Sequence, residues 1–117
     1  MESQLELYGD IKKYATDYCE DALPDVMSAY NMLRDNAYKD GALSHKVKRL
    51  IALGIALRAG CTQCILHQTK LGVEAGASKA EVMEAVSVAI AMSGSTAIGW
   101  SWRVIRMLEE LGKWQTD

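Results

Sequence analysis

The chain has 117 residues and a formal net charge of -2 at pH 7, and 50% of its residues are hydrophobic. A chain of this length and balance is most simply one globular domain, 1–117, with a single modest core. The small negative charge gives no electrostatic reason to expect nucleic acid or an anionic membrane as a partner. The N-terminal sequence MESQLELYGDIKKY lacks the apolar stretch of a secretory signal. The apolar runs are also too short to span a bilayer, so we expect a cytoplasmic protein.

The spacing of apolar residues predicts an all-α protein. Apolar positions recur three and four residues apart, and no segment alternates with the period of a strand. Pro24 suits the first turn of a helix, Ser44 an N-cap and Gly60 a C-terminal stop. Ser78 and Glu81 have the spacing of a capping box. We therefore expect a bundle of about six helices, at residues 4–21, 24–40, 44–58, 61–75, 78–92 and 96–111.

Two of the expected helices contain long apolar segments with almost no charge. Residues 50–57 have none, and residues 82–92 have only Glu84. A helix that is apolar on every side must be buried on every side, and a small six-helix domain has little room for two such helices. The sequence therefore predicts a homo-oligomer in which one apolar face is buried against another copy. A tight monomeric bundle is the alternative.

The segment CTQCILHQ contains a pair of cysteines at an expected helix start. Cys61 and Cys64 are three residues apart, so they share one face of the helix. The helix dipole favours a thiolate at such a position, and the two sulfurs are close enough to close a disulfide. This is the chemistry of a redox dithiol. His67 lies on the same side and could transfer a proton, or it could be a surface histidine without a role.

A zinc site is the alternative chemistry for this cysteine pair. A structural zinc site needs four ligands, usually supplied by a second pair of closely spaced residues. Only Cys19, His45 and His67 remain, and their spacing does not form such a pair, so we expect no metal. Cys19 is expected to be a buried or half-buried free thiol. His45 is placed in the first turn of the third helix and is assigned no role.

The sequence also resembles a known family. The run KRLIALGIALRAGCTQCILHQTKLGVEAGASKAEVMEAV is similar to the carboxymuconolactone decarboxylase family, specifically its alkylhydroperoxidase D-like branch. The resemblance is strongest over 43–108. It includes the apolar helix before the cysteines, Ile65 directly after the second cysteine, and the EAGAS turn into the next helix. It implies an all-helical bundle in which a two-helix hairpin buries the motif, assembled as a dimer, trimer or hexamer.

The resemblance implies roles for individual residues. In peroxidase-active members, a glutamate before the motif and a histidine after it relay protons to the second cysteine, which becomes a sulfenic acid. The first cysteine then closes the disulfide. Cys61 and Cys64 match these cysteines, but Arg49 occupies the glutamate position and Gln68 the histidine position, with His67 one residue early. One residue turns a helix by about 100°, so His67 cannot simply replace Gln68.

These departures change the expected chemistry. Gln68 cannot accept and release a proton at neutral pH. Arg49 is a permanent cation that would favour a thiolate by its charge rather than by taking a proton. The sequence therefore predicts that the dithiol is kept while the acid–base relay is rebuilt or lost.

The sequence predicts an antioxidant thiol oxidoreductase with peroxidase activity, which reduces a small peroxide or disulfide. It would need no bound cofactor but would need a reducing dithiol partner. The expected site residues are Cys61, Cys64 and His67, with Arg49 and Gln68 as relay or thiolate-stabilising residues. A lyase that holds a small carboxylic acid with Arg49 or Arg58 is an alternative, although the family's decarboxylases generally lack the cysteine pair. A non-catalytic oligomeric binding protein is another.

Overall fold

The computed structural model describes residues 1–115, which form helices and loops without a strand, so the predicted all-α class is confirmed. The helices α1, η1 and α2 follow one another without a break and act as one rod. Residues 1–115 therefore form six helical rods, as expected, although the π-helical stretch η1 within the first rod was not predicted. The elements are α1 (Gln4–Ile11), η1 (Lys12–Asp17), α2 (Tyr18–Ala22), α3 (Pro24–Tyr38), α4 (His45–Ala59), α5 (Thr62–Glu74), α6 (Lys79–Ser93) and α7 (Ser95–Glu110).

The helices begin where their capping residues predict. The Ser44 side chain accepts a hydrogen bond from the Val47 amide and caps α4. Ser78 and Glu81 form a complete capping box at the start of α6, in which each side chain accepts a hydrogen bond from the other residue's backbone. Pro24 lies in the first turn of α3, where its missing N–H leaves no helical bond unmade. Local chemistry therefore fixes most of the helix boundaries.

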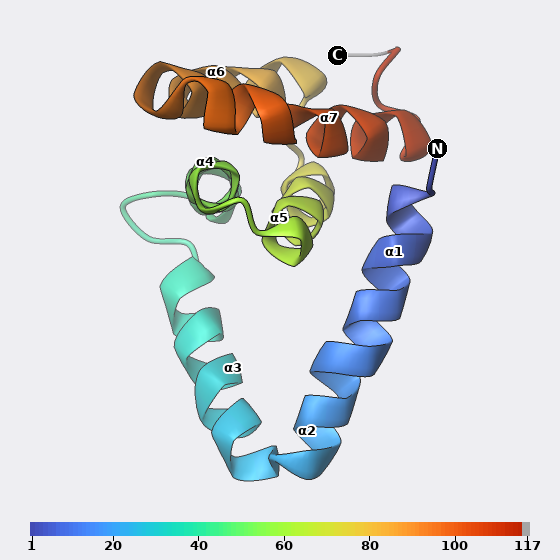
Figure 1. Ribbon diagram of the computed structural model, residues 1–117. Helices are drawn as coiled ribbons and strands as arrows, with labels where there is room; N and C mark the ends of the chain where they lie inside the picture. The colour runs from blue at the N-terminus through green and yellow to red at the C-terminus, as the bar shows by residue number, and fades with distance from the viewer. Residues whose placement is uncertain (116–117) are drawn as a thin grey trace.

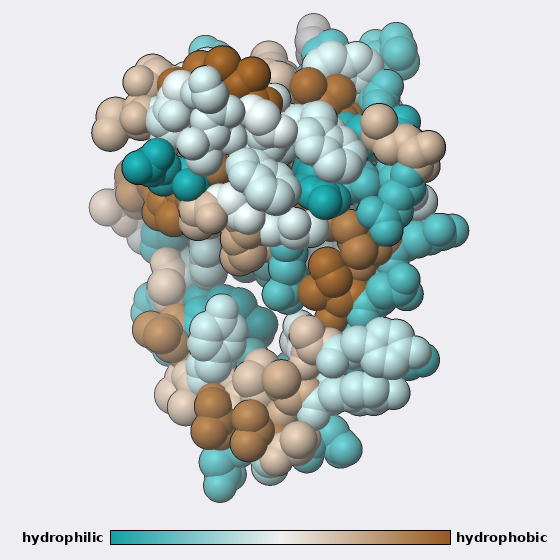
Figure 2. Space-filling model, viewed as in Figure 1, coloured by the Kyte–Doolittle hydropathy of each residue, from teal (hydrophilic) through white to brown (hydrophobic). Residues whose placement is uncertain are grey.

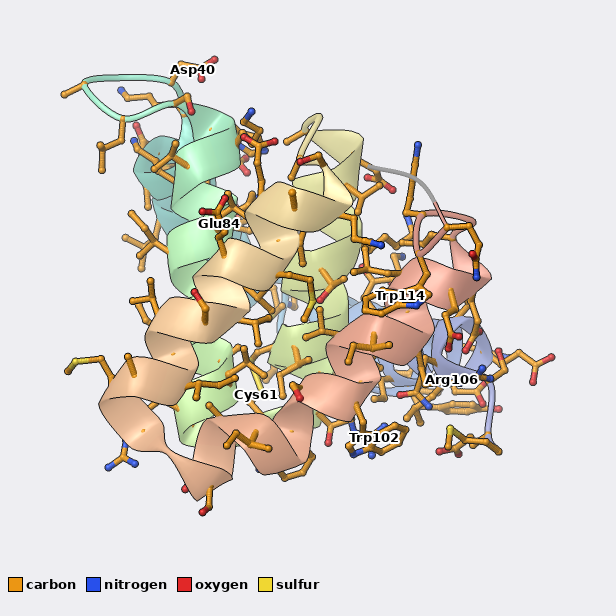
Figure 3. All side chains as sticks on the ribbon, turned by 90° about the horizontal axis from the view of Figure 1, so that it is seen from above. Asp40, Cys61, Glu84, Trp102, Arg106 and Trp114 are labelled. Carbon is orange, nitrogen blue, oxygen red and sulfur yellow. A yellow bond between two sulfur atoms is a disulfide. The ribbon has the colours of Figure 1, made fainter. Side chains whose placement is uncertain are left out.

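Helices α4 to α7 pack together as the bundle that holds the core. Helix α4 packs against α5, α6 and α7, and α5 and α6 each pack against α7. Figure 3 looks down on α6 and α7 and shows Cys61 in the angle between these two helices. Burial of branched apolar side chains from all four helices stabilises this arrangement. The core includes Leu53, Leu57, Ile65, Val82, Val86, Val104 and Leu108.

Two arms extend from the bundle and meet at their far ends. The first arm consists of α1, η1 and α2, and the second arm is α3; Figure 1 shows them converging at the turn before Pro24. The start of the first arm is tied to α7, because the Glu110 carboxylate accepts hydrogen bonds from the Ser3 hydroxyl and from the amides of Gln4 and Leu5. Large apolar side chains on the arms are exposed, among them Tyr14, Tyr18, Val26, Tyr30, Met32 and Leu33.

The two helices that were expected to be buried on every side are not enclosed within this chain. Ile55 on α4 is 65% exposed and Met92 on α6 is 83% exposed. With Ile51 and Val88 they line a groove of about 830 Å³ between the two helices, which we call the α4–α6 groove. One small bundle has too little interior to cover both helices. Across residues 1–115, no helix combines the length and the apolar content that crossing a bilayer requires.

Candidate functional site

The turn between α4 and α5 places the first cysteine. Gly60 ends α4 with φ at 68°, in the left-handed region that favours glycine. A Cβ atom at this residue would lie 2.8 Å from the indole nitrogen of Trp100. The chain then enters α5 with Cys61 as its N-cap, and the Cys61 sulfur accepts a hydrogen bond from the Cys64 amide at 3.2 Å. The expected helix-start position of Cys61 is confirmed.

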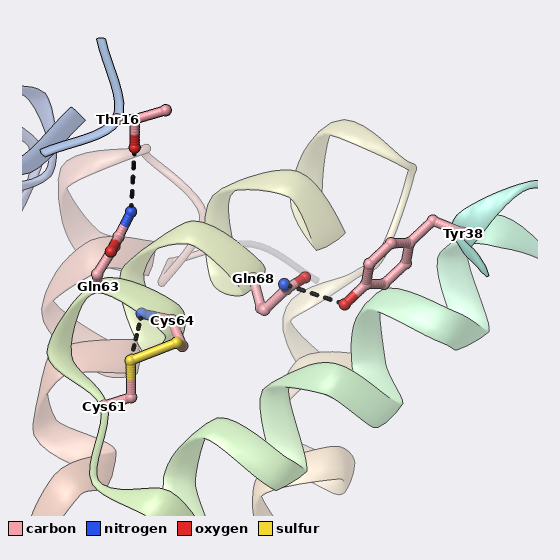
Figure 4. Close-up of a disulfide and its surroundings, with 6 residues drawn as sticks. All are labelled: Thr16, Tyr38, Cys61, Gln63, Cys64 and Gln68. Atoms are coloured by element: carbon pink, nitrogen blue, oxygen red, sulfur yellow. Dashed lines mark hydrogen bonds between the residues drawn. A yellow bond between two sulfur atoms is a disulfide. The ribbon is translucent and has the colours of Figure 1, made fainter. Parts of the chain in front are cut away.

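Cys61 and Cys64 are joined as a disulfide, with their Cα atoms 5.2 Å apart. Figure 4 shows the bond at the first turn of α5, with side chains from both arms around this helix. Cys64 is exposed and borders a cavity, whereas Cys61 is half-buried and is not part of the cavity wall. Cys64 is therefore the sulfur that a small molecule in this cavity would meet.

The cavity has a volume of about 480 Å³ and lies between α5 and the two arms. Figure 2 shows the opening between the bundle above and the arms below. Cys19 is exposed and lines this cavity, so the expectation of a buried or half-buried thiol is wrong. Cys19 lies on the short helix α2 of the first arm, which projects away from the core and cannot cover it. The lining also includes Tyr8, Arg34, Cys64, His67 and Gln68.

His67 lies on the wall of the cavity and contacts the first arm. Its Nδ1 atom is 2.8 Å from the Tyr8 hydroxyl oxygen, and the two rings are stacked with centroids 5.8 Å apart. Burial lowers the pKa of His67 below its usual value, and the positive charges of Arg49 and Arg34 lower it further. The imidazole is therefore mainly neutral at pH 7. No local sequence pattern indicated Tyr8, because this tyrosine is separated from His67 by 59 positions along the chain.

Arg49 and Gln68 lie next to each other, and of the two only Gln68 lines the cavity. Arg49 is only 7% exposed, and its Nη1 donates to the Gln68 side-chain oxygen at 3.2 Å. The Gln68 side-chain nitrogen donates to the Tyr38 hydroxyl at 3.3 Å (Figure 4), and the Arg49 guanidinium lies 3.7 Å from the centre of the Tyr38 ring. Burial lowers the pKa of Arg49. The side chains at the two relay positions are therefore in contact. They interact with each other and with Tyr38.

Other residues singled out in the sequence lie away from the cysteines. The ring of His45 contacts the Tyr38 carbonyl through Nδ1 at 2.7 Å and Arg49 through Nε2 at 3.4 Å. Arg58 lines the α4–α6 groove, which is a different surface from the cavity that Cys64 borders. Within the described residues, no three histidine, cysteine or acidic side chains are placed to hold a metal ion together.

These features define an all-helical protein whose cysteine pair begins a helix and faces a cavity. Residues 24–107 match the sequence profile of the carboxymuconolactone decarboxylase family, and the chain belongs to this family. The match begins before residue 43, where the resemblance read from the sequence begins, and it takes in the second arm.

Solved structures of family members share the fold. A carboxymuconolactone decarboxylase family protein from Legionella pneumophila, solved in its apo form, has a TM-score of 0.89 and 26% identity, covering 97% of this chain and 100% of that one. A family protein from Thermotoga maritima, described as "possibly involved in antioxidative response", has a TM-score of 0.78 and 25% identity, covering 92% of each chain. The similarity to both extends over the arms as well as the bundle.

Two curated relatives are also similar in sequence. An uncharacterized protein from Cupriavidus necator is 29% identical over 90 residues, which is 77% of this chain and 80% of the relative. An uncharacterized protein encoded in the cox locus of Paracoccus denitrificans is 31% identical over 86 residues, which is 74% of this chain and 78% of the relative. These similarities establish the family but not the reaction.

Proposed function

We propose that the protein is a thiol oxidoreductase of the alkylhydroperoxidase D-like type, which reduces a small peroxide through Cys61 and Cys64. The observation that carries this proposal is the unequal placement of the two sulfurs. Cys64 is exposed and borders a cavity together with His67, whereas Cys61 is half-buried at the N-cap of α5. The antioxidative role suggested for the Thermotoga maritima relative is consistent with this reaction.

The reaction has three steps, and the first two oxidise the dithiol. The Cys64 thiolate attacks one peroxide oxygen, the O–O bond breaks, and the other oxygen leaves as an alcohol after taking a proton. Cys64 is then a sulfenic acid. The Cys61 thiolate attacks the sulfur of Cys64, which forms the disulfide and releases hydroxide, and this takes a proton to become water. An external dithiol then reduces the Cys61–Cys64 disulfide by exchange and is itself oxidised to a disulfide.

The N-cap position suits Cys61 for the second step. The Cys64 amide donates a hydrogen bond to the Cys61 sulfur, and the positive end of the α5 dipole lies at the same place. Both effects stabilise a thiolate, which is the form that attacks the sulfenic acid. They also make Cys61 a good leaving group when an external thiolate attacks the exposed sulfur of Cys64. The reducing partner is therefore a dithiol that can reach the cavity.

The arginines to which the sequence assigned the lyase role do not line the cavity at Cys64. Arg49 is buried behind Gln68, and Arg58 faces the α4–α6 groove. Neither arginine belongs to the wall that Cys64 borders. A carboxylate at the Cys64 cavity would therefore not be held by the arginines to which the sequence assigned this role.

The proposal is tested with cysteine variants in a Cys19→Ser background, which leaves only the two thiols of the motif. The reduced parent protein should reduce cumene hydroperoxide with dithiothreitol as donor and should form the 61–64 disulfide in mass spectra. Cys64→Ser should abolish turnover. Cys61→Ser should stop after the first step, so that dimedone traps a sulfenic acid on Cys64. Turnover that survives in Cys64→Ser, or dimedone labelling that is absent in Cys61→Ser, would refute the proposed roles.

A further inference from the structure

The hydrogen bond between Tyr8 and His67 joins the first arm to the redox helix at the wall of the cavity. We propose that His67 is the general base of Cys64 and that Tyr8 is the residue that orients it, in place of a relay through residues 49 and 68. This inference rests on the proposed dithiol function and assigns a role to a tyrosine that the family motif does not contain. Under this inference, the first arm contributes a residue, Tyr8, to the catalytic site.

The geometry leaves one nitrogen of His67 for the reaction. His67 is three residues after Cys64, so their side chains are neighbours on α5, and both border the cavity. Tyr8 occupies the Nδ1 atom. For the described residues, the structure gives no hydrogen-bond partner to the other ring nitrogen, Nε2. The stacked Tyr8 ring also restricts rotation of the imidazole. The imidazole is thus held at the wall of the cavity, and Nε2 is the ring nitrogen that remains for the reaction.

The proposed proton path uses one of the two neutral tautomers of His67. In this tautomer, Nδ1–H donates to the Tyr8 hydroxyl oxygen, which leaves a lone pair on Nε2. Nε2 takes the proton of the Cys64 thiol, and the resulting thiolate attacks the peroxide. The Nε2–H of the imidazolium then gives the same proton to the departing alkoxide, which leaves as an alcohol. The Nδ1 hydrogen bond remains in place throughout, as it does wherever a third group orients a catalytic histidine.

The charges around His67 keep it in the form that this role needs. Charged groups on three elements act on its ring: Arg34 on α3, Arg49 on α4, and Lys70 and Glu74 on α5. Lys12 and Asp17 on η1 and Glu20 on α2 line the same cavity. Burial disfavours a second proton on the ring most strongly, and the three cations add to this effect, whereas Glu74 opposes it. The ring is therefore a free base at neutral pH, and the same cations favour the thiolate that it generates.

The alternative pair cannot do this work. Arg49 donates a hydrogen bond to Gln68 and lies over the Tyr38 ring, and Gln68 donates to the Tyr38 hydroxyl. Neither the arginine nor the glutamine side chain changes its protonation near neutral pH. By contrast, Tyr8 lines the cavity, and contacts outside the cavity hold its helix in place. Helix α1 is held at its start by the Glu110 carboxylate, one turn before Tyr8. The hydrogen bonds to Glu110 therefore help to hold Tyr8 against His67.

The kinetic test compares Tyr8→Phe with Tyr14→Phe in the Cys19→Ser background. Phenylalanine keeps the ring but removes the hydroxyl, and Tyr14 is an exposed tyrosine of the same arm that does not line the cavity. Reduced protein is mixed with hydrogen peroxide in a stopped-flow instrument, and formation of the disulfide is followed from pH 5 to 9. Loss of one orienting hydrogen bond should slow oxidation at pH 7 about fivefold to tenfold and change the shape of the pH profile. Tyr14→Phe should match the parent, and His67→Asn should lose about 10²-fold or more.

A second measurement separates orientation from a merely structural role. Nitrogen NMR of the reduced parent protein should show His67 protonated at Nδ1, and Tyr8→Phe should show a mixture of the two neutral tautomers. An unchanged rate or an unchanged tautomer in Tyr8→Phe would overturn the inference, as would a parent tautomer protonated at Nε2. A parent protein that forms no 61–64 disulfide with peroxide would instead refute the proposed function. In that case, a His67 protonated at Nδ1 would show that Tyr8 orients the ring, although the protein does not reduce peroxide.

Discussion

At the scale of single residues, two neighbours in the sequence serve different parts of the molecule. His67 contacts Tyr8 on the first arm, whereas Gln68 contacts Arg49 on α4 and Tyr38 at the end of the second arm. The helix turns by about 100° between consecutive residues, which is why adjacent side chains reach different partners. Both side chains line the cavity, but the titratable one contacts the first arm and the non-titratable one contacts the second arm. Under the proposed mechanism, their order in the sequence decides which arm takes part in proton transfer.

The lowered pKa of His67 makes stability depend on pH. The unfolded chain, with a histidine pKa of about 6.5, binds a proton more readily than the folded protein does. The unfolding free energy should therefore be independent of this group above about pH 6.5 and should decrease as the pH falls below it. His67→Asn cannot take up this proton, so its stability should fall less steeply between about pH 7 and 5. Urea unfolding at a series of pH values measures the two slopes, and equal slopes would contradict the argument.

At the scale of helices, the turn before the cysteines determines where the disulfide lies. Gly60 combines a left-handed φ with a close approach to the Trp100 indole, so α4 can reverse into α5 while α7 packs over the turn. Any other residue would meet both constraints at once. The position of Cys61 at the N-cap therefore depends on a glycine that takes no part in the chemistry.

We expect Gly60→Ala to destabilise the protein more than Gly76→Ala does. Both glycines have a positive φ, which costs alanine about 1–2 kcal/mol. At Gly76 a new Cβ meets nothing within 4 Å, whereas at Gly60 it would lie 2.8 Å from Trp100. Gly76→Ala thus measures the backbone strain, and the additional loss in Gly60→Ala measures the steric clash. Urea unfolding of both variants provides the comparison, and equal losses would show that Trp100 moves away without cost.

Local signals in the sequence predicted the helices better than the site. Pro24, Ser44 and the capping box of Ser78 act within one turn, so their effects can be read from neighbouring residues. The site depends on contacts between distant segments. The contact of Tyr8 with His67 spans 59 positions, and no local pattern marks it. The π-helical stretch in the first arm likewise has no sequence signal of its own.

At the scale of the whole molecule, apolar surface is left over in two places. The α4–α6 groove is lined by exposed apolar side chains, and the arms carry others at their far ends. Exposed apolar patches of this kind commonly mark surfaces that contact other proteins. A further copy of the chain is the occupant that the sequence predicts for the groove, because residues 50–57 carry no charge and residues 82–92 carry only Glu84.

We predict that the protein is a homo-oligomer and that the groove is one of its contact surfaces. Light scattering should give a mass that is a multiple of 12.9 kDa. Replacing both Ile55 and Met92 with glutamate should place charges in the groove and shift the mass toward a single chain. Ile98→Glu, at an exposed position on α7 outside the groove, is the matched control and should keep the parent mass. A parent protein that is monodisperse at 12.9 kDa would refute the prediction.

The bond network of Glu110 bears on the order in which the molecule assembles. It joins residues that are 105 to 107 positions apart, whereas the cysteines lie in a hairpin of neighbouring helices. Closing a long loop costs more chain entropy than closing a short one, so contacts within the hairpin are expected to form early and the docking of α1 late. Tyr8 arrives with α1. A folding chain would thus hold its two thiols close together before the histidine beside them has a partner.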